Sequence, residues 1–111
     1  MEITQEKNGN INIIKVKGRL DASTSSKLEE ALDGYTGQDK VRVLVDCQEL
    51  DYISSAGLRV LLSAAKDFQK HSGKICLATL NANVKQVFEI SGFTSIFPIY
   101  ASTEEAVTDM S

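Results

Sequence analysis

The chain has 111 residues, 42% of them hydrophobic and 24% charged, which is the composition of one globular domain, residues 1–111, and not of a disordered segment. Its formal net charge of −3 argues against direct binding to nucleic acid, and its apolar runs fall far short of the roughly 20 residues that cross a bilayer. The first residues contain no signal peptide, so we expect a cytoplasmic protein in which Cys47 and Cys76 are reduced thiols of the core.

A β-hairpin is expected at the N-terminus. Residues 11–17 alternate apolar and polar side chains, which is typical of a strand with one buried face. Asn8-Gly9-Asn10 is a turn signal, and residues 2–6 are expected to form the partner strand. Gly18 and Asp21 are expected to end the second strand of this hairpin.

A helix is predicted next, starting near Ser23 and ending at Gly37. It is indicated by apolar residues at helical spacing, namely Leu28, Ala31, Leu32 and Tyr35. Ser26 and Glu29 fit a capping box at its start, and Asp21 or Ser23 are the alternative caps.

Residues 41–46 predict a strand that is buried on both faces, because they are few and rich in β-branched side chains. The acidic residues that follow, Asp46, Glu49 and Asp51, are expected to be solvated in a loop. A magnesium site at these carboxylates is the less favoured alternative.

A second helix is predicted after this loop and ends at His71-Ser72-Gly73. Its apolar stripe consists of Leu58, Leu61, Leu62, Ala65 and Phe68. Residues 74–78 then predict another buried strand.

The last third of the chain predicts one more strand between two helices. Val84, Val87 and Phe88 indicate a short helix that stops at Gly92. Residues 96–100 are expected to form a strand, which Pro98 places at a sheet edge. A capping box, Ser102 and Glu105, starts the final helix.

Strand and helix therefore alternate from residue 11 to the end of the chain. This order predicts an α/β fold with a small, mostly parallel sheet, an N-terminal antiparallel hairpin and about four helices.

Sequence patterns for catalysis are weak. There is no dinucleotide fingerprint, no P-loop and no G-x-S-x-G elbow. His71 is the only histidine, and at a helix C-terminus it suits the helix dipole. Cys47 and Cys76 lack the C-x-x-C spacing of metal and redox sites. We therefore expect no catalytic residue, metal or cofactor, and a protein that is not an enzyme.

One segment favours a function. Residues 50–62, LDYISSAGLRVLL, follow a buried strand and open the second helix, where backbone N–H groups lack partners. Serine is a favoured N-cap, so Ser54 and Ser55 have a purely structural explanation. The alternative is that one hydroxyl accepts a phosphoryl group, whose charge of roughly −1.5 to −2 would change which partner can dock.

This segment resembles the signature of STAS domains (sulfate transporter and anti-sigma factor antagonist), in which one or two serines, Gly and Leu follow an apolar strand. Three further blocks agree in order: Gly18-Arg19-Leu20-Asp21 resembles the family's G-x-L-D, residues 43–46 its central strand, and residues 83–93 its closing helix. The resemblance covers about residues 3–108 and is to the stand-alone bacterial form, the anti-sigma factor antagonist.

The resemblance implies regulation by partner switching. In this family the unphosphorylated antagonist binds an anti-sigma factor that is also a serine kinase, and so frees a sigma factor for transcription. The kinase phosphorylates the antagonist and weakens the complex, and a PP2C-type phosphatase restores it.

The resemblance also implies site residues. The phospho-accepting serine lies two positions before the motif glycine, Gly57, which gives Ser55 here. Many family members have Asp at the preceding position, which is Ser54 in this chain, so Ser54 is the alternative phosphosite. Asp21 matches a family aspartate on the neighbouring loop, and Leu58 matches the motif leucine. The resemblance implies a partner-binding surface made of Asp21, Ser54, Ser55, Gly57, Leu58 and Arg59.

Arg59, where family members often have a small residue, is the last residue of the implied partner-binding surface. It could pair with a phosphate on Ser55 or with an acidic partner, and as an exposed helix charge it could equally do neither.

Two other functions remain open from the sequence. STAS-like domains also serve as permanent, unphosphorylated subunits of assemblies such as lipid-transport ATPase complexes. A small nucleotide-using or hydrolytic α/β enzyme is the third possibility, which the missing phosphate loop and catalytic base disfavour.

Overall fold

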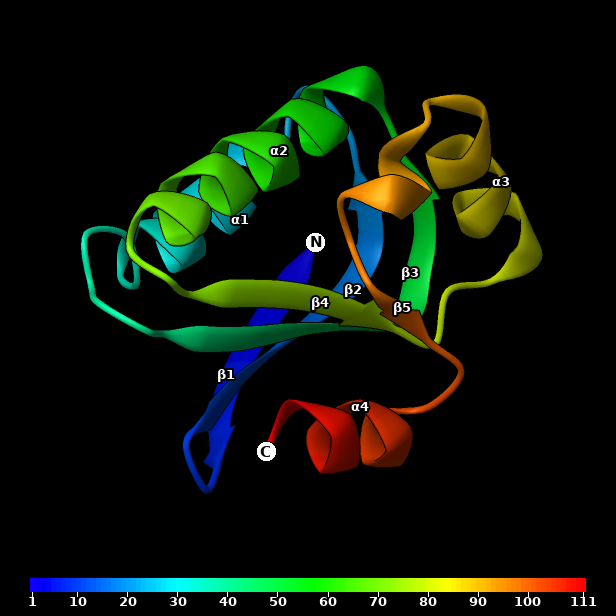
Figure 1. The fold of residues 1–111 in the computed structure, drawn as a ribbon. Coiled ribbons are helices and arrows are strands. Elements are labelled where there is room, and N and C mark those ends of the chain that lie inside the picture. Colours follow the sequence, from blue (N-terminus) through cyan, green and yellow to red (C-terminus); the bar gives the residue numbers. More distant parts are fainter.

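The computed structural model describes residues 1–111, which form a five-stranded sheet with helices on both faces (Figure 1). The sheet order follows the chain, β1-β2-β3-β4-β5; β1 is antiparallel to β2, and all other neighbours are parallel. The strands are β1 (Glu2–Asn8), β2 (Ile11–Leu20), β3 (Arg42–Ile53), β4 (Lys74–Ala78) and β5 (Ile99–Tyr100). The helices are α1 (Ser25–Asp33), α2 (Ser55–Lys70), α3 (Ala82–Ile90) and α4 (Thr103–Met110), with a 3₁₀ turn at Phe93–Ser95. The predicted α/β fold class is confirmed.

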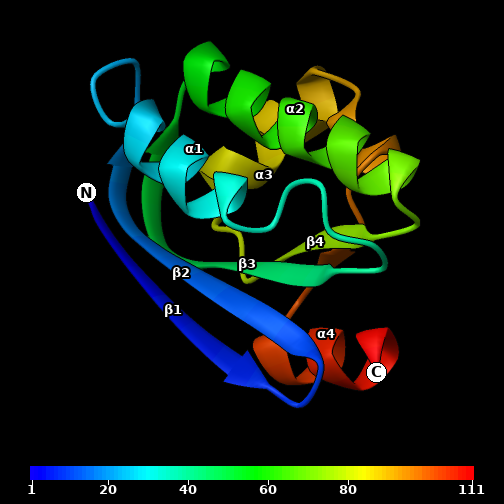
Figure 2. The same cartoon turned by 90° about the vertical axis from the view of Figure 1, so that its left-hand side faces the viewer.

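Two apolar cores hold the layers together. Helices α1, α2 and α3 lie on one face of the sheet and α4 on the other, as Figures 1 and 2 show. The larger core, of 20 buried residues, lies between the sheet and the first three helices, and includes Leu28, Leu61 and Phe88. The smaller core, of 7 buried residues, packs Ala106 and Met110 of α4 against the other face. None of the helices has the length and apolar character that crossing a membrane would require.

The N-terminal hairpin is confirmed, but Gly18 does not end its second strand. Strand β2 continues to Leu20, and Gly18 pairs with Leu50 of β3 while adopting a φ of +105°. The pairing between β2 and β3 shifts register on both sides of this glycine. In both shifts the additional residue lies on β3, and β2 stays paired through Gly18, so the glycine does not terminate the strand.

The acidic residues placed in a loop by the sequence lie on β3 instead. This strand runs for 12 residues to Ile53, and it includes Asp46, Glu49 and Asp51. Glu49 and Asp51 are exposed, whereas Asp46 is only 7% exposed. No group of three or more His, Cys, Asp or Glu side chains is arranged to hold a metal ion.

Helix starts follow the predicted positions within one or two residues, but the cap of α1 differs. Its N-cap is Thr24, and Ser26 already lies inside the helix, so the predicted capping box of Ser26 and Glu29 is wrong. Asp21 instead accepts the N–H groups of Ser23 and Thr24. At α4 the predicted cap is confirmed, since Ser102 Oγ accepts the Glu105 N–H at 3.1 Å.

The last strand is at the sheet edge, as Pro98 predicts, but it has only two residues. Ile96 and Phe97 precede it in irregular backbone, and Pro98 contributes only its carbonyl oxygen, which accepts the Leu77 N–H at 2.9 Å. Proline has no N–H to continue the ladder, which explains the shortening.

The cysteines and the histidine have the predicted structural positions. Cys47 and Cys76 are free and buried, and burial raises the pKa of Cys47 to about 12 and that of Cys76 to about 11. His71 is the C-cap of α2, where its Nδ1 lies 3.0 Å from the Asp67 carbonyl oxygen.

Candidate functional site at the start of α2

The serine segment joins the end of β3 directly to α2, with no loop between them. Ser54 is the N-cap of α2, and its backbone N–H donates to the carbonyl oxygen of Leu20 at 2.9 Å. This bond fixes the helix start against the end of β2. Asp21 is the residue that follows Leu20 in the chain.

The two serine hydroxyls have different roles. Ser54 Oγ accepts the backbone N–H of Gly57 at 3.3 Å, so it caps the helix. Ser55, the first residue of α2, is exposed, and its hydroxyl takes part in no hydrogen bond within the chain. Only the Ser55 hydroxyl is thus free for chemistry without loss of the cap.

Asp21 organises the turn that leads into α1. Its Oδ1 accepts the Ser23 N–H at 3.0 Å and the Ser23 hydroxyl at 2.7 Å, and it also accepts the Thr24 N–H at 3.2 Å. The hydrogen bond from the Ser23 side chain is the main cause that lowers the pKa of Asp21. The turn between β2 and α1 therefore carries a fixed negative charge.

Arg19 and Tyr52 lie near Asp21, and the sequence did not indicate that these two side chains are in contact. The Arg19 guanidinium lies 4.3 Å from the centre of the Tyr52 ring, and its Nε is 4.0 Å from Asp21 Oδ2. Tyr52 is 41% exposed, so this pair lies at the surface. The register shift after Gly18 aligns Arg19 with Tyr52, and this register has no local sequence signal.

Gly57 and Leu58 lie beneath the surface. Leu58 is 7% exposed and packs in the larger core. A Cβ on Gly57 would lie 2.6 Å from Leu20 Cγ and 3.1 Å from Ile53 Cγ1. The glycine therefore allows the helix to approach the ends of β2 and β3, so that Gly57 and Leu58 position the serines from below.

Arg59 is exposed one helical turn after Ser55 and makes no ion pair within the chain. Residues four apart in a helix are neighbours on its surface, with their Cβ atoms roughly 5–6 Å apart. Ser55 and Arg59 are thus exposed neighbours on the first turn of α2, next to the N-cap Ser54.

Residues 2–106 of the chain match the STAS domain family. The chain belongs to the STAS family. A relative from Bordetella bronchiseptica, named as the anti-sigma factor antagonist BtrV, is 41% identical over 106 residues, which cover 96% of this chain and 91% of that protein. The anti-sigma-B factor antagonist of Listeria monocytogenes is 31% identical over 99 residues, covering 89% of this chain and 86% of the relative.

The STAS fold is also seen in a solved structure. The structure of the Bacillus cell fate determinant SpoIIAA in its phosphorylated form superposes with a TM-score of 0.77 and 18% sequence identity, covering 99% of this chain and 100% of that one. The similarity in fold thus extends along the whole chain.

The structural roles of Ser54 and Ser55 can be distinguished by how their replacement changes the stability of this STAS domain. Ser54→Ala removes the N-cap and is expected to lower the free energy of unfolding by about 1 kcal/mol. Ser55→Ala removes an exposed hydroxyl without a partner and should change it by less than about 0.5 kcal/mol. Urea denaturation followed by circular dichroism measures both values. Ser54→Asp, which keeps a capping oxygen, is the control, and equal effects of the two alanine variants would contradict the assignment.

Proposed function

We propose that this STAS protein is an anti-sigma factor antagonist whose binding to its partner is switched off by phosphorylation of Ser55. The partner is an anti-sigma factor that is also a serine kinase, and its capture frees a sigma factor for transcription. A PP2C-type phosphatase restores the binding form in the cytoplasm. The protein acts by changing which complexes form and does not itself catalyse a reaction. The names of the relatives from Bordetella and Listeria support the antagonist part of this proposal.

The observation that carries the phosphorylation proposal is the free, exposed hydroxyl of Ser55 at the first position of α2. The neighbouring serine is occupied as the N-cap, so it is the less suitable acceptor. The solved SpoIIAA structure in its phosphorylated form supports the idea that this fold accommodates such a modification.

The partner-binding surface of the proposal consists of Asp21, Ser54, Ser55 and Arg59, with Gly57 and Leu58 holding it in place. A phosphate on Ser55 adds negative charge beside Asp21, whose carboxylate is already ionised at neutral pH. An interface formed with the neutral hydroxyl would then have to desolvate a doubly charged group. Loss of binding follows without any change of the backbone.

The rigidity of α2 supports a switch that acts through charge. Leu58, Leu61 and Phe68 are buried against the sheet, and each such side chain contributes roughly 1.5–3 kcal/mol. The serine is thus attached to a helix that is held by its packing, and we expect this helix to stay folded when its first residue is modified.

Mass spectrometry of the chain from its own host tests the proposal. Intact mass and fragment mapping, with phosphatases inhibited during lysis, should show a phosphate on Ser55 whose occupancy differs between growth and stress. A phosphate on Ser54 would support the proposed switch but would make Ser54, and not Ser55, the modified residue. Absence of phosphate under every condition would favour a permanent, unmodified subunit of an assembly such as a lipid-transport ATPase complex.

A further inference from the structure

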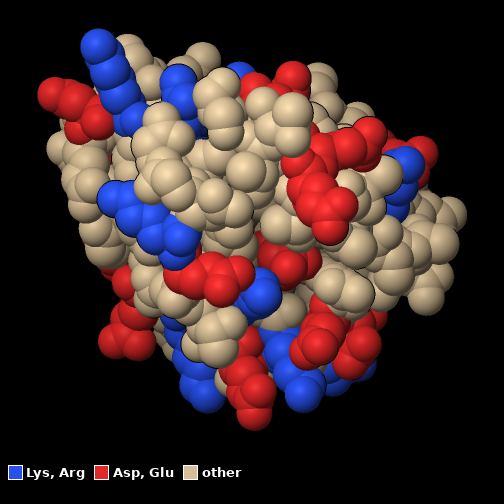
Figure 3. Space-filling model, turned by 90° about the horizontal axis from the view of Figure 1, so that it is seen from below, with Lys and Arg blue, Asp and Glu red and all other residues tan.

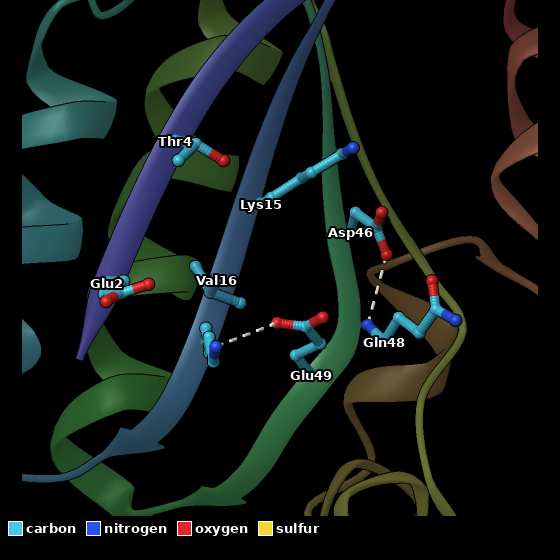
Figure 4. A pocket seen from close by; sticks show the side chains of 8 residues that line it. Glu2, Thr4, Lys15, Val16, Asp46, Gln48 and Glu49 are labelled. Carbon is cyan, nitrogen blue, oxygen red and sulfur yellow. Dashed lines mark hydrogen bonds and ion pairs between the residues drawn. The ribbon is translucent and has the colours of Figure 1, made fainter.

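The face of the sheet that carries α4 contains a polar pocket away from the serine site. Alternate residues of β2 and β3 point to this face: Ile11, Ile13 and Leu44 lie under α4, and Lys15, Lys17 and Asp46 continue the rows beyond the helix. Seen from that side, acidic and basic side chains are intermixed on the surface (Figure 3). The pocket has a volume of about 200 Å³ and is lined from β1, β2 and β3 (Figure 4).

Asp46 is the only charged residue of the protein that is buried, with 7% of its surface exposed. One carboxylate oxygen, Oδ1, accepts the backbone N–H of Gln48 at 3.1 Å. The other oxygen points away from that bond and has no partner in the chain (Figure 4). Every fully buried side-chain oxygen or nitrogen of the protein has a hydrogen-bond partner. This carboxylate oxygen has none, so it is not fully buried and opens into the pocket.

Neither lysine of the pocket forms an ion pair with this carboxylate, although Lys15 extends toward it (Figure 4). Lys15 lies opposite Asp46 in the sheet register, but its Nζ is paired with Glu6 at 3.2 Å. The Nζ of Lys17 lies 3.9 Å from Glu49. Asp46 therefore has no ion-pair partner, which is unusual because a buried charge normally requires one.

We propose that the pocket binds an organic cation, an ammonium or guanidinium group, through the free oxygen of Asp46. The positive charge supplies the missing partner, and N–H donors satisfy the carboxylate, a combination that strengthens a hydrogen bond about twofold. Glu2, which also lines the pocket without an ion-pair partner, adds to the preference for a cation. The volume is below the roughly 300–1,000 Å³ of pockets for drug-sized ligands, so a single headgroup fits.

This site is independent of the proposed serine switch. The cation comes from one of two sources, a basic side chain of a protein partner or a free amine, and their shared chemistry is what Asp46 recognises. A metal ion is a poorer occupant, because Asp46 is not joined by two further ligands in a suitable arrangement.

Nuclear magnetic resonance titration of the full chain tests the site. N-acetyl-arginine amide is expected to shift the amide signals of Asp46 and Gln48 in a saturable way. N-acetyl-citrulline amide has nearly the same shape without the charge and should bind at least tenfold more weakly. Asp46→Asn, which keeps the acceptor for the Gln48 N–H, should weaken the arginine probe at least tenfold, whereas Glu104→Gln, on α4 outside the pocket, should leave it unchanged.

Putrescine distinguishes the two sources. Tighter binding of putrescine than of the arginine probe supports a free amine, and the reverse order supports a side chain of a partner. Equal shifts with the arginine and citrulline probes, or shifts that never saturate, would overturn the proposal. The comparison of these two probes uses the unaltered protein, so it decides the question even where Asp46→Asn fails to fold.

Discussion

Phosphorylation of Ser55 is expected to weaken the complex with the anti-sigma factor roughly 150-fold, which corresponds to a penalty of about 3 kcal/mol. The reason is that a group of charge roughly −2 replaces an exposed hydroxyl at a contact surface that already contains Asp21. Isothermal titration calorimetry with the purified anti-sigma factor of the same host measures the change.

Two substitutions provide the controls for this experiment. Ser55→Ala should bind like the unmodified chain and resist the kinase, and Ser55→Asp, with a single negative charge, should lose at least about tenfold in affinity. Equal affinities of Ser55→Ala and Ser55→Asp for the kinase would refute the switch. Ser63→Asp is the matched control for charge alone, because Ser63 is exposed on α2 two turns further along the helix.

Gly57→Ala is expected to lower the free energy of unfolding by about 1–3 kcal/mol, the usual cost of overpacking. The added methyl group would lie 2.6 Å from Leu20 Cγ and 2.8 Å from Leu20 Cδ2, so the helix start or the leucine must move. For a domain of about 100 residues, each kcal/mol lowers the thermal midpoint by about 4–8 °C. Differential scanning calorimetry measures this midpoint.

Gly34→Ala is the matched control for the glycine experiment. Gly34 is also at a helix end, with a φ of −62°, and a Cβ there would have Ala31 O as its nearest neighbour at 3.4 Å, an ordinary contact. Its replacement should leave stability unchanged or raise it by up to about 1 kcal/mol. A loss with Gly34→Ala as large as that with Gly57→Ala would show that close packing at α2 is not the cause.

The positions of the helices and of the first part of β1, β2, β3 and β4 could be predicted from the sequence, because apolar spacing records which face is buried. Leu28 and Leu32 of α1, and Leu58, Leu61 and Phe68 of α2, are buried as their spacing predicts. The second half of β3 could not be predicted. Two bulges there break the period of two, so Leu50 and Ile53 reach the core while the exposed residues Glu49 and Asp51 on either side of Leu50 resemble a loop.

The site was predictable in outline and not in its chemistry. The motif places both serines at a helix start, but which hydroxyl caps the helix depends on a backbone bond between Ser54 and Leu20, residues far apart in the chain. The burial of Asp46 likewise results from neighbouring strands and has no local signal. Its role in binding a cation stays a prediction, as do the phosphosite and the partner surface.

The short, proline-limited β5 has a consequence for the exchange of partners that we propose. Open strand edges can template the addition of strands from other molecules, which leads to aggregation. Here one edge of the sheet is a two-residue strand beside Pro98, and the other, β1, carries Glu2, Glu6 and Lys7. Between two complexes the free molecule therefore offers little edge to its own copies, and it can accumulate unbound until a partner arrives.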